Sequence, residues 1–257
     1  FKIIYNITGD VMIEKDKLLT LNKKDRILVS NILDKYRQYQ KTKKGVASNF
    51  LNPSEMKLVT NYLNYYQIPY SIYDKYPFLE KKIIYFGEYE SYLTFYQIKA
   101  DTSLTHSEIL GSLFALGLND NVIGDIFVEK DSYYVSLSKL DSYLLENFHY
   151  VGNKLIELIP ISELSLTENH LQNFTIMVSS MRVDIIVSKL ANKSRSQVND
   201  LITSKKIFLN YQELKNNSIL LKENDILSIR HVGKFKIGTK LGNTKKDNII
   251  LEINQYK

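Results

Sequence analysis

Apolar residues in the first third of the chain recur with helical spacing. Within residues 22–41 they fall three or four positions apart, which predicts an amphipathic helix, and a basic run at 35–44 ends it. A second helix is predicted to begin at Asn52, because Pro53 suits the first helical position and Glu55 completes a capping box. These elements predict a small α/β N-terminal domain over residues 1–82.

The middle of the chain alternates strand and helix patterns. Thr105 and Glu108 form a second capping box, and Ser138 is a predicted N-cap. The order is βαββαβ, with elements predicted at 93–98, 107–116, 125–129, 133–137, 139–148 and 154–159. This order is typical of a ferredoxin-like, RRM-like domain, here placed at 83–162. Many RNA-recognition domains share it, yet unrelated proteins do too, so the fold alone does not assign RNA binding.

The last third begins after a predicted connector at 163–180. Arg182 opens a helix, and Ser194 with Gln197 caps a second one, followed by strands at 207–210 and 226–229. We expect this module to occupy 181–257. The fold class predicted for the whole chain is therefore α+β.

Charge is divided unevenly between these segments. Residues 181–257 hold 15 Lys and Arg against seven Asp and Glu, a net charge of +8, whereas residues 1–180 hold 19 against 21, a net of −2. A basic segment of this kind is the electrostatic footprint of nucleic-acid binding. The absence of cysteine excludes disulfides, thiolate metal sites and a cysteine nucleophile, and suits the cytoplasm. No segment has the length and apolar character of a membrane span, so no membrane partner is expected.

The candidate RNA-binding residues follow from charge and from helix ends. Arg195 stands near a helix N-terminus, whose free N–H groups favour anions, and it can make forked contacts to phosphate. Asn210 is a candidate for contacts to sugar or base edges. The predicted set is Arg182, Lys189, Lys193, Ser194, Arg195, Gln197, Lys205, Lys206, Asn210, Arg230, Lys234 and Lys236.

The arrangement of these residues resembles the S4 RNA-binding domain. The matching positions are Arg182-x-Asp184, Ser194-Arg195, Leu201-Ile202 and Ile207-x-Leu209-Asn210. One position departs from the pattern, since Lys205 stands where members of that family usually have glycine. Lysine adopts a left-handed backbone less readily, so the turn geometry there is open.

Further motifs resemble the YlmH family. They are the segment 50–55, with Asn52 where the family usually has aspartate, the glycine-bearing segments 106–118 and 123–126, Phe235-x-Ile237 and the segment 242–246. The resemblance implies a bacterial, non-enzymatic factor, without cofactor or metal, expected to act as a monomer. It would bind rRNA of large ribosomal subunits obstructed by peptidyl-tRNA, and would help the tail-adding factor RqcH extend stalled chains with alanine.

Two functions other than that of a ribosome-binding factor stay open as alternatives. The first is a cell-division-associated interaction protein, in which RNA binding is secondary. The second is an RNA-modifying enzyme, because S4 domains are also attached to pseudouridine synthases and methyltransferases. Arg182-Val183-Asp184 superficially resembles a pseudouridine synthase element, but Asp184 lies in a short module without the catalytic domain. No glycine-rich nucleotide loop occurs, and the four histidines lack metal-ligand spacing, so no catalytic residue is assigned.

Overall fold

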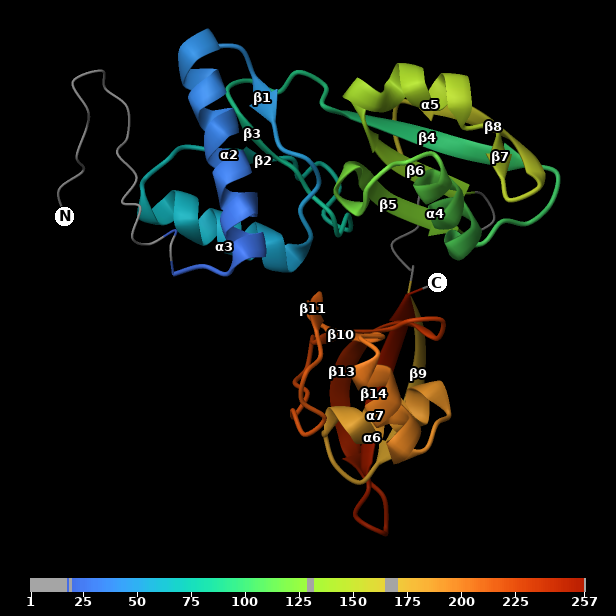
Figure 1. Ribbon diagram of the computed structural model, residues 1–257. Helices are drawn as coiled ribbons and strands as arrows, with labels where there is room; N and C mark the ends of the chain where they lie inside the picture. Colours follow the sequence, from blue (N-terminus) through green and yellow to red (C-terminus); the bar gives the residue numbers. More distant parts are fainter. Residues whose placement is uncertain (1–17, 19, 129–131, 165–170, 257) are drawn as a thin grey trace. The chain divides into compact units, whose positions relative to one another are not determined.

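The computed structural model describes residues 18, 20–128, 132–164 and 171–256 (Figure 1). The chain divides into two compact units, Phe1–Ser165 and Leu166–Lys257. Each unit combines helices with sheet, which confirms the α+β class.

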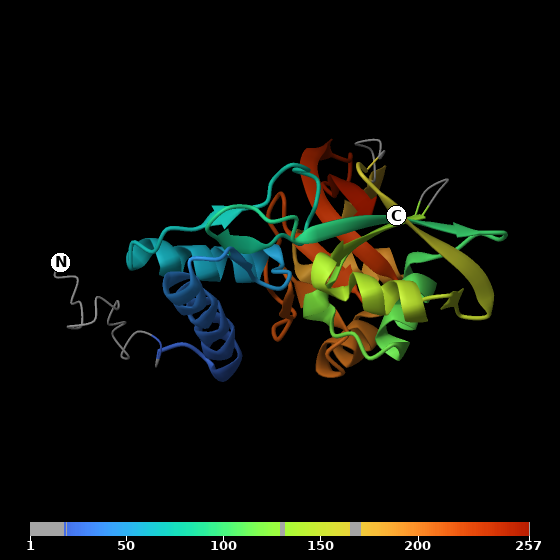
Figure 2. The ribbon, with the colours of Figure 1, turned by 90° about the horizontal axis from the view of Figure 1, so that it is seen from above.

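The first part of unit 1 joins two helices to a three-stranded sheet. The helices are α2 (Lys23–Thr42) and α3 (Pro53–Tyr65), and the sheet has the order β1 (Val46–Ala47), β3 (Ile84–Phe86), β2 (Ser71–Ile72). The two helices lie side by side (Figures 1 and 2). The predicted boundary at residue 83 is wrong, because β3 pairs with β1 and β2 and so belongs to this first domain.

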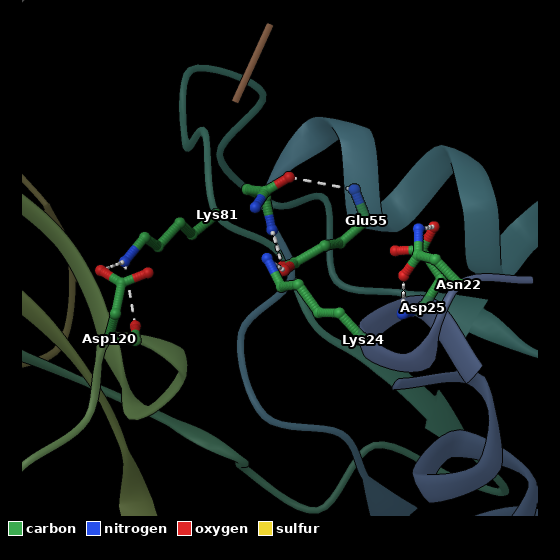
Figure 3. A network of polar contacts seen from close by, with 7 residues as sticks. Asn22, Lys24, Asp25, Glu55, Lys81 and Asp120 are labelled. Atoms are coloured by element: carbon green, nitrogen blue, oxygen red, sulfur yellow. Dashed lines mark hydrogen bonds and ion pairs between the residues drawn. The ribbon is translucent and has the colours of Figure 1, made fainter. Parts of the chain in front are cut away.

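Local capping defines where both helices begin. The Asn52 side chain accepts from the Glu55 N–H at 3.0 Å, and Glu55 accepts from the Asn52 N–H at 3.2 Å, which confirms the predicted capping box. Figure 3 shows Lys24 of α2 close to the same carboxylate, with 3.4 Å between Lys24 Nζ and Glu55 Oε1. Asn22 caps α2 by accepting from the Asp25 N–H. The two helix starts are thereby tied to each other.

The second part of unit 1 is a ferredoxin-like domain, as predicted. Its antiparallel sheet has the order β5-β6-β4-β8, with the short β7 at the edge beside β8. The sheet and helix bounds are β4 Leu93–Ala100, α4 His106–Ala115, β5 Ile123–Val128, β6 Ser132–Leu137, α5 Asp141–Asn147, β7 Tyr150–Val151 and β8 Lys154–Ile161. Short 3-10 turns, Asp120–Val122 and Ser138–Leu140, precede β5 and α5. Ser138 starts this turn and donates to the Ser91 carbonyl, so it does not cap α5.

The N-terminal domain covers the sheet face that lies opposite α4 and α5. Tyr96 and Tyr134 point to the helices, and the alternating residues Phe95 and Val135 point the other way, yet both are buried. The Phe95 ring lies 5.3 Å from Tyr76 and 6.4 Å from Tyr73, measured between centroids. Aromatic side chains from both domains therefore pack together at this face, which we call the aromatic seam.

Polar contacts hold the same seam in register. The carboxylate of Asp125 on β5 accepts from the backbone N–H groups of Glu80 and Lys81 at 2.8 and 3.1 Å. Lys81 Nζ donates to Asp120 Oδ1 at 2.9 Å and to the Ile123 carbonyl, as Figure 3 shows for the Asp120 pair. The two domains of unit 1 thus share one polar and aromatic boundary.

Unit 2 is a six-stranded antiparallel sheet with two helices on one face. The order is β11-β10-β12-β13-β14-β9. The bounds are β9 Leu171–Val178, α6 Val183–Ala191, α7 Arg195–Thr203, β10 Ile207–Leu209, β11 Gln212–Glu213, β12 Ile226–Ile229, β13 Gly233–Asn243 and β14 Ile249–Tyr256. The connector predicted at 163–180 is wrong over residues 171–178, because β9 pairs along its whole length with β14. The module therefore begins before residue 181.

Burial of Asp125 leads to a prediction about pH. Desolvation, with a smaller contribution from Glu80, raises the pKa of Asp125 to about 6 from 3.8. The folded state therefore binds this proton more tightly than the unfolded state, so the contribution of Asp125 to stability falls as pH rises from about 4 to about 6. We expect Asp125→Asn to be more stable than the wild type above pH 6, by up to about 3 kcal/mol, with a difference that shrinks toward pH 4. Urea unfolding of both proteins across this range measures it, and a constant difference would contradict the prediction.

Candidate nucleic-acid interface

The start of α7 combines a capping box with an exposed arginine. Ser194 Oγ accepts from the Gln197 N–H at 3.3 Å, and Gln197 Oε1 accepts from the Ser194 N–H at 3.0 Å, which confirms the predicted capping box. Their side chains therefore fix the helix end. Arg195, the first helical residue, is exposed. This residue stands at the positive end of the helix dipole, where a phosphate is favoured.

Arg182 and Asp184 form a forked ion pair at the start of α6. Arg182 Nε and Nη2 donate to the two Asp184 carboxylate oxygens, both at 3.0 Å. Asp184 is 5% exposed, and the Arg182 hydrogen bonds, with a further effect of Arg195, hold its pKa below the usual value. Arg182, Asp184 and Arg195 are thereby neighbours. The guanidinium of Arg182 is held in place by this pair.

The turn after α7 contains Lys205 at the position where S4 domains usually have glycine. Its φ is +55°, so lysine does occupy the left-handed region that usually favours glycine. The N–H groups of Lys205 and Lys206 donate to the carbonyls of Ile202 and Leu201, which closes the helix. Lys205 Nζ lies 3.4 Å from Glu213 Oε2, and both side chains are largely exposed. Lys189 and Lys193, at the end of α6 and just beyond it, are also exposed.

The remaining predicted residues lie on the other face of the sheet. Ile207, Leu227, Phe235 and Ile237 point into the core beneath α6 and α7. Strand alternation then directs their neighbours to the opposite face. The predicted residues concerned are Lys206, Arg230, Lys234 and Lys236. Apart from Asn210, the twelve predicted residues are thus divided between the helical side of unit 2 and the opposite face of its sheet.

Asn210 has a structural role. Its φ is +49°, its Nδ2 donates to Asp225 Oδ1 at 2.9 Å, and its Oδ1 accepts from the Ile226 N–H at 2.9 Å. The side chain therefore joins the β10–β11 turn to the start of β12.

Two tyrosines on the open face were missed by the sequence reasoning. Lys234 Nζ lies 4.8 Å from the ring centroid of Tyr211 and 5.1 Å from that of Tyr256, within cation–π range. The large number of tyrosines in the chain concealed this pair. One signal in the sequence was available: Lys234 and Lys236 alternate with the apolar residues Phe235 and Ile237, as expected for a strand with one charged face.

Unit 1 offers different chemistry. An RRM binds bases on aromatic residues of its central strands, but here the corresponding face, which includes Phe95 and Val135, is buried. A basic site remains near the boundary of the two domains. Desolvation lowers the pKa of Lys139, and desolvation together with the charge of Lys139 lowers the pKa of Lys35 on α2. Lys139 also donates to Asn49 Oδ1 at 2.7 Å.

Two other kinds of site are absent from the described ranges. No three histidine, aspartate or glutamate residues there are grouped so that they could hold a metal ion. None of the helices in the same part of the chain combines the length and hydropathy needed to cross a membrane.

Unit 2 thus contains two helices, the second capped and bearing Arg195, and these precede most strands of an antiparallel sheet. Comparisons with known protein families identify this arrangement as an RNA-binding domain. The S4 domain model matches residues 181–227, and the model described as the putative RNA-binding domain in YlmH matches 91–165. The chain therefore contains matches to both domain models, in the two segments where the sequence resembles these families.

Two individual proteins are also similar. Ribosome-associated protein quality control protein P2 of Bacillus subtilis (strain 168) is 24% identical over 238 residues, which cover 88% of this chain and 93% of that protein. A solved structure, cell division protein YlmH from Streptococcus pneumoniae, has a TM-score of 0.45 and 17% identity, and the match covers 55% of this chain and 93% of that one.

We call the side of unit 2 that bears α6 and α7 the helical face. Its two arginines, Arg182 and Arg195, should differ in their contribution to the stability of the fold. Arg182→Ala leaves the buried Asp184 carboxylate without its partner, so we expect the midpoint of thermal unfolding to fall by roughly 2–8 °C. Arg195→Ala, at an exposed position, should shift it by less than about 1 °C. Because a depressed pKa stabilises the fold only above the unfolded value, the effect of Arg182→Ala should shrink below about pH 4. Equal effects of the two variants at neutral pH would contradict the assignment.

Proposed function

We propose that this protein is a non-enzymatic RNA-binding factor that acts on the large ribosomal subunit. The observation that carries the proposal is the helical face of unit 2, where Arg195 stands exposed at the capped start of α7 with Lys193 nearby in sequence. Guanidinium and ammonium groups at a helix N-terminus favour phosphate oxygens. Such contacts position an RNA without reading its sequence, which suits the recognition of one folded ribosomal state.

Beyond RNA binding, we propose a specific role in ribosome-associated quality control. Its support is the similarity to the Bacillus subtilis protein, whose name states that process, together with the two RNA-binding domain matches. We propose that the chain binds rRNA and the peptidyl-tRNA of obstructed large subunits. By holding the tRNA, it would support alanine tailing of stalled chains by RqcH in the cytoplasm.

The state of Asp184 argues against the modifying-enzyme alternative. A catalytic carboxylate must reach its substrate, whereas Asp184 is buried and both of its oxygens accept from Arg182. It also accepts from the Ile185 N–H at 3.0 Å. These bonds suit a residue that orders the start of α6, so we propose that the protein acts without catalysis.

The central test is loss of ribosome binding without loss of fold. Arg195→Ala should weaken cosedimentation with large subunits carrying peptidyl-tRNA, while Arg37→Ala, an exposed arginine of α2, serves as the control. The logarithm of the affinity should fall with the logarithm of salt concentration, with a slope of about −0.7 to −0.9 per neutralised phosphate, and Arg195→Ala should make the slope shallower by about one such contact. Unchanged cosedimentation of Arg195→Ala would overturn the proposed face.

Arg195→Ala also tests whether RNA binding serves ribosome-associated quality control. In cells lacking the endogenous protein, the wild type should restore alanine tails on stalled chains, and Arg195→Ala should restore them less. If the wild type binds subunits but never affects tailing, RNA binding stands and the quality-control role fails. A cell-division defect as the sole consequence of loss would support the interaction-protein alternative.

A further inference from the structure

The sheet of unit 2 has one face without helices, and its residues share a chemistry. Core residues alternate along the strands with Phe208 on β10, Ser228 on β12, and Lys234 and Lys236 on β13. The strand register places Ser228 opposite both Phe208 and Lys234, and Lys236 opposite both Ile226 and Asn254. One half of this face therefore presents aromatic and cationic groups together.

Lys234 organises the aromatic part. Its ammonium lies over Tyr211 in the β10–β11 turn and over Tyr256 at the end of β14, at 4.8 and 5.1 Å from the two centroids. All three side chains remain partly exposed. The two rings are held in fixed positions on either side of a positive charge, so binding would require little further ordering of them.

The charge on this half of the face is positive. Lys206 and Arg230, linked by the Arg230 N–H donating to the Lys206 carbonyl at 2.9 Å, join Lys234 and Lys236. The nearby acids have other contacts: Glu213 pairs with Lys205, and Glu252, further along β14, lies near Thr239. A phosphate backbone would complement this charge.

We infer that this face binds single-stranded RNA as a second contact, separate from the helical face. Aromatic rings beside cations form the usual platform for single strands, since bases stack on the rings and phosphates meet the cations. Bases in a duplex are already stacked and cannot reach such rings, which is why the inference specifies a single strand. It rests on the proposed function only in taking RNA as the ligand of unit 2.

Matched charge removal in the full-length protein tests the inference. Lys234→Gln with Lys236→Gln removes two charges from the face, and Lys245→Gln with Lys246→Gln removes two exposed charges from the β13–β14 turn. With a twelve-nucleotide uridine RNA as the probe, the first pair should lower affinity about tenfold or more, and the control pair about twofold or less. Equal losses would mean general electrostatic attraction and would overturn the inference, as would the absence of measurable binding by the wild type.

Two further measurements keep the result interpretable. Arg195→Ala should weaken binding of a structured RNA hairpin while leaving the uridine RNA within about twofold, so a failure of the helical face and a failure of the sheet face give different outcomes. Crosslinking of the wild type to uridine RNA containing 4-thiouridine covers the case in which the lysine variant does not fold. Crosslinks in peptides with Tyr211 or Tyr256 support the inference, and crosslinks confined to residues 182–205 overturn it.

Discussion

The candidate interface depends on the apolar core shared by α6, α7 and the sheet of unit 2. Each helix has nine residues, and helices shorter than about 12 residues are marginal on their own in water. Val183, Ile186, Val187 and Val198 are fully buried against sheet residues such as Leu227 and Phe235. This packing fixes the two helix starts. The Ser194–Gln197 box then places Arg195 at the start of α7, where its charge acts on Asp184 of the Arg182–Asp184 pair.

The ferredoxin-like domain of unit 1 does not expose the sheet face with which an RRM binds RNA. A ferredoxin-like sheet with aromatic residues on its central strands resembles an RRM, but the segment between β2 and β3 supplies Tyr73, Tyr76 and Phe78, which cover that face. Asp125 binds two backbone N–H groups of the same segment. Base stacking on this face would require the domains of unit 1 to separate. The exposed cations of unit 2 therefore offer the more direct route to RNA.

Local signals in the sequence predicted local structure well. The capping boxes at Asn52, Thr105 and Ser194 all formed, because each depends on side chains three residues apart. The ferredoxin-like order was also predictable, since its strands and helices alternate clearly. The strand pairings that the sequence did not predict are non-local. β3 joins a sheet built from distant strands, and the paired residues of β9 and β14 are 71 to 85 positions apart.

The candidate site shows the same limit. Charge and helix ends identified Arg195 and the lysines, but a list of residues carries no information about which face each occupies. Strand register, which comes from the completed sheet, separated Lys234 and Lys236 from the helical face and brought Tyr211 and Tyr256 to Lys234. The structural bonds of Asn210 could not be predicted for a related reason, because its partner Asp225 lies 15 residues away.

We propose above all that the start of α7 contacts RNA phosphates directly. Hydrogen–deuterium exchange of the full-length protein, with and without large ribosomal subunits carrying peptidyl-tRNA, measures this most directly. The account predicts slower exchange on binding at the backbone amides of residues 194–197 and of the turn at 204–206. Protection confined to unit 1, with the exchange of these amides unchanged, would contradict it.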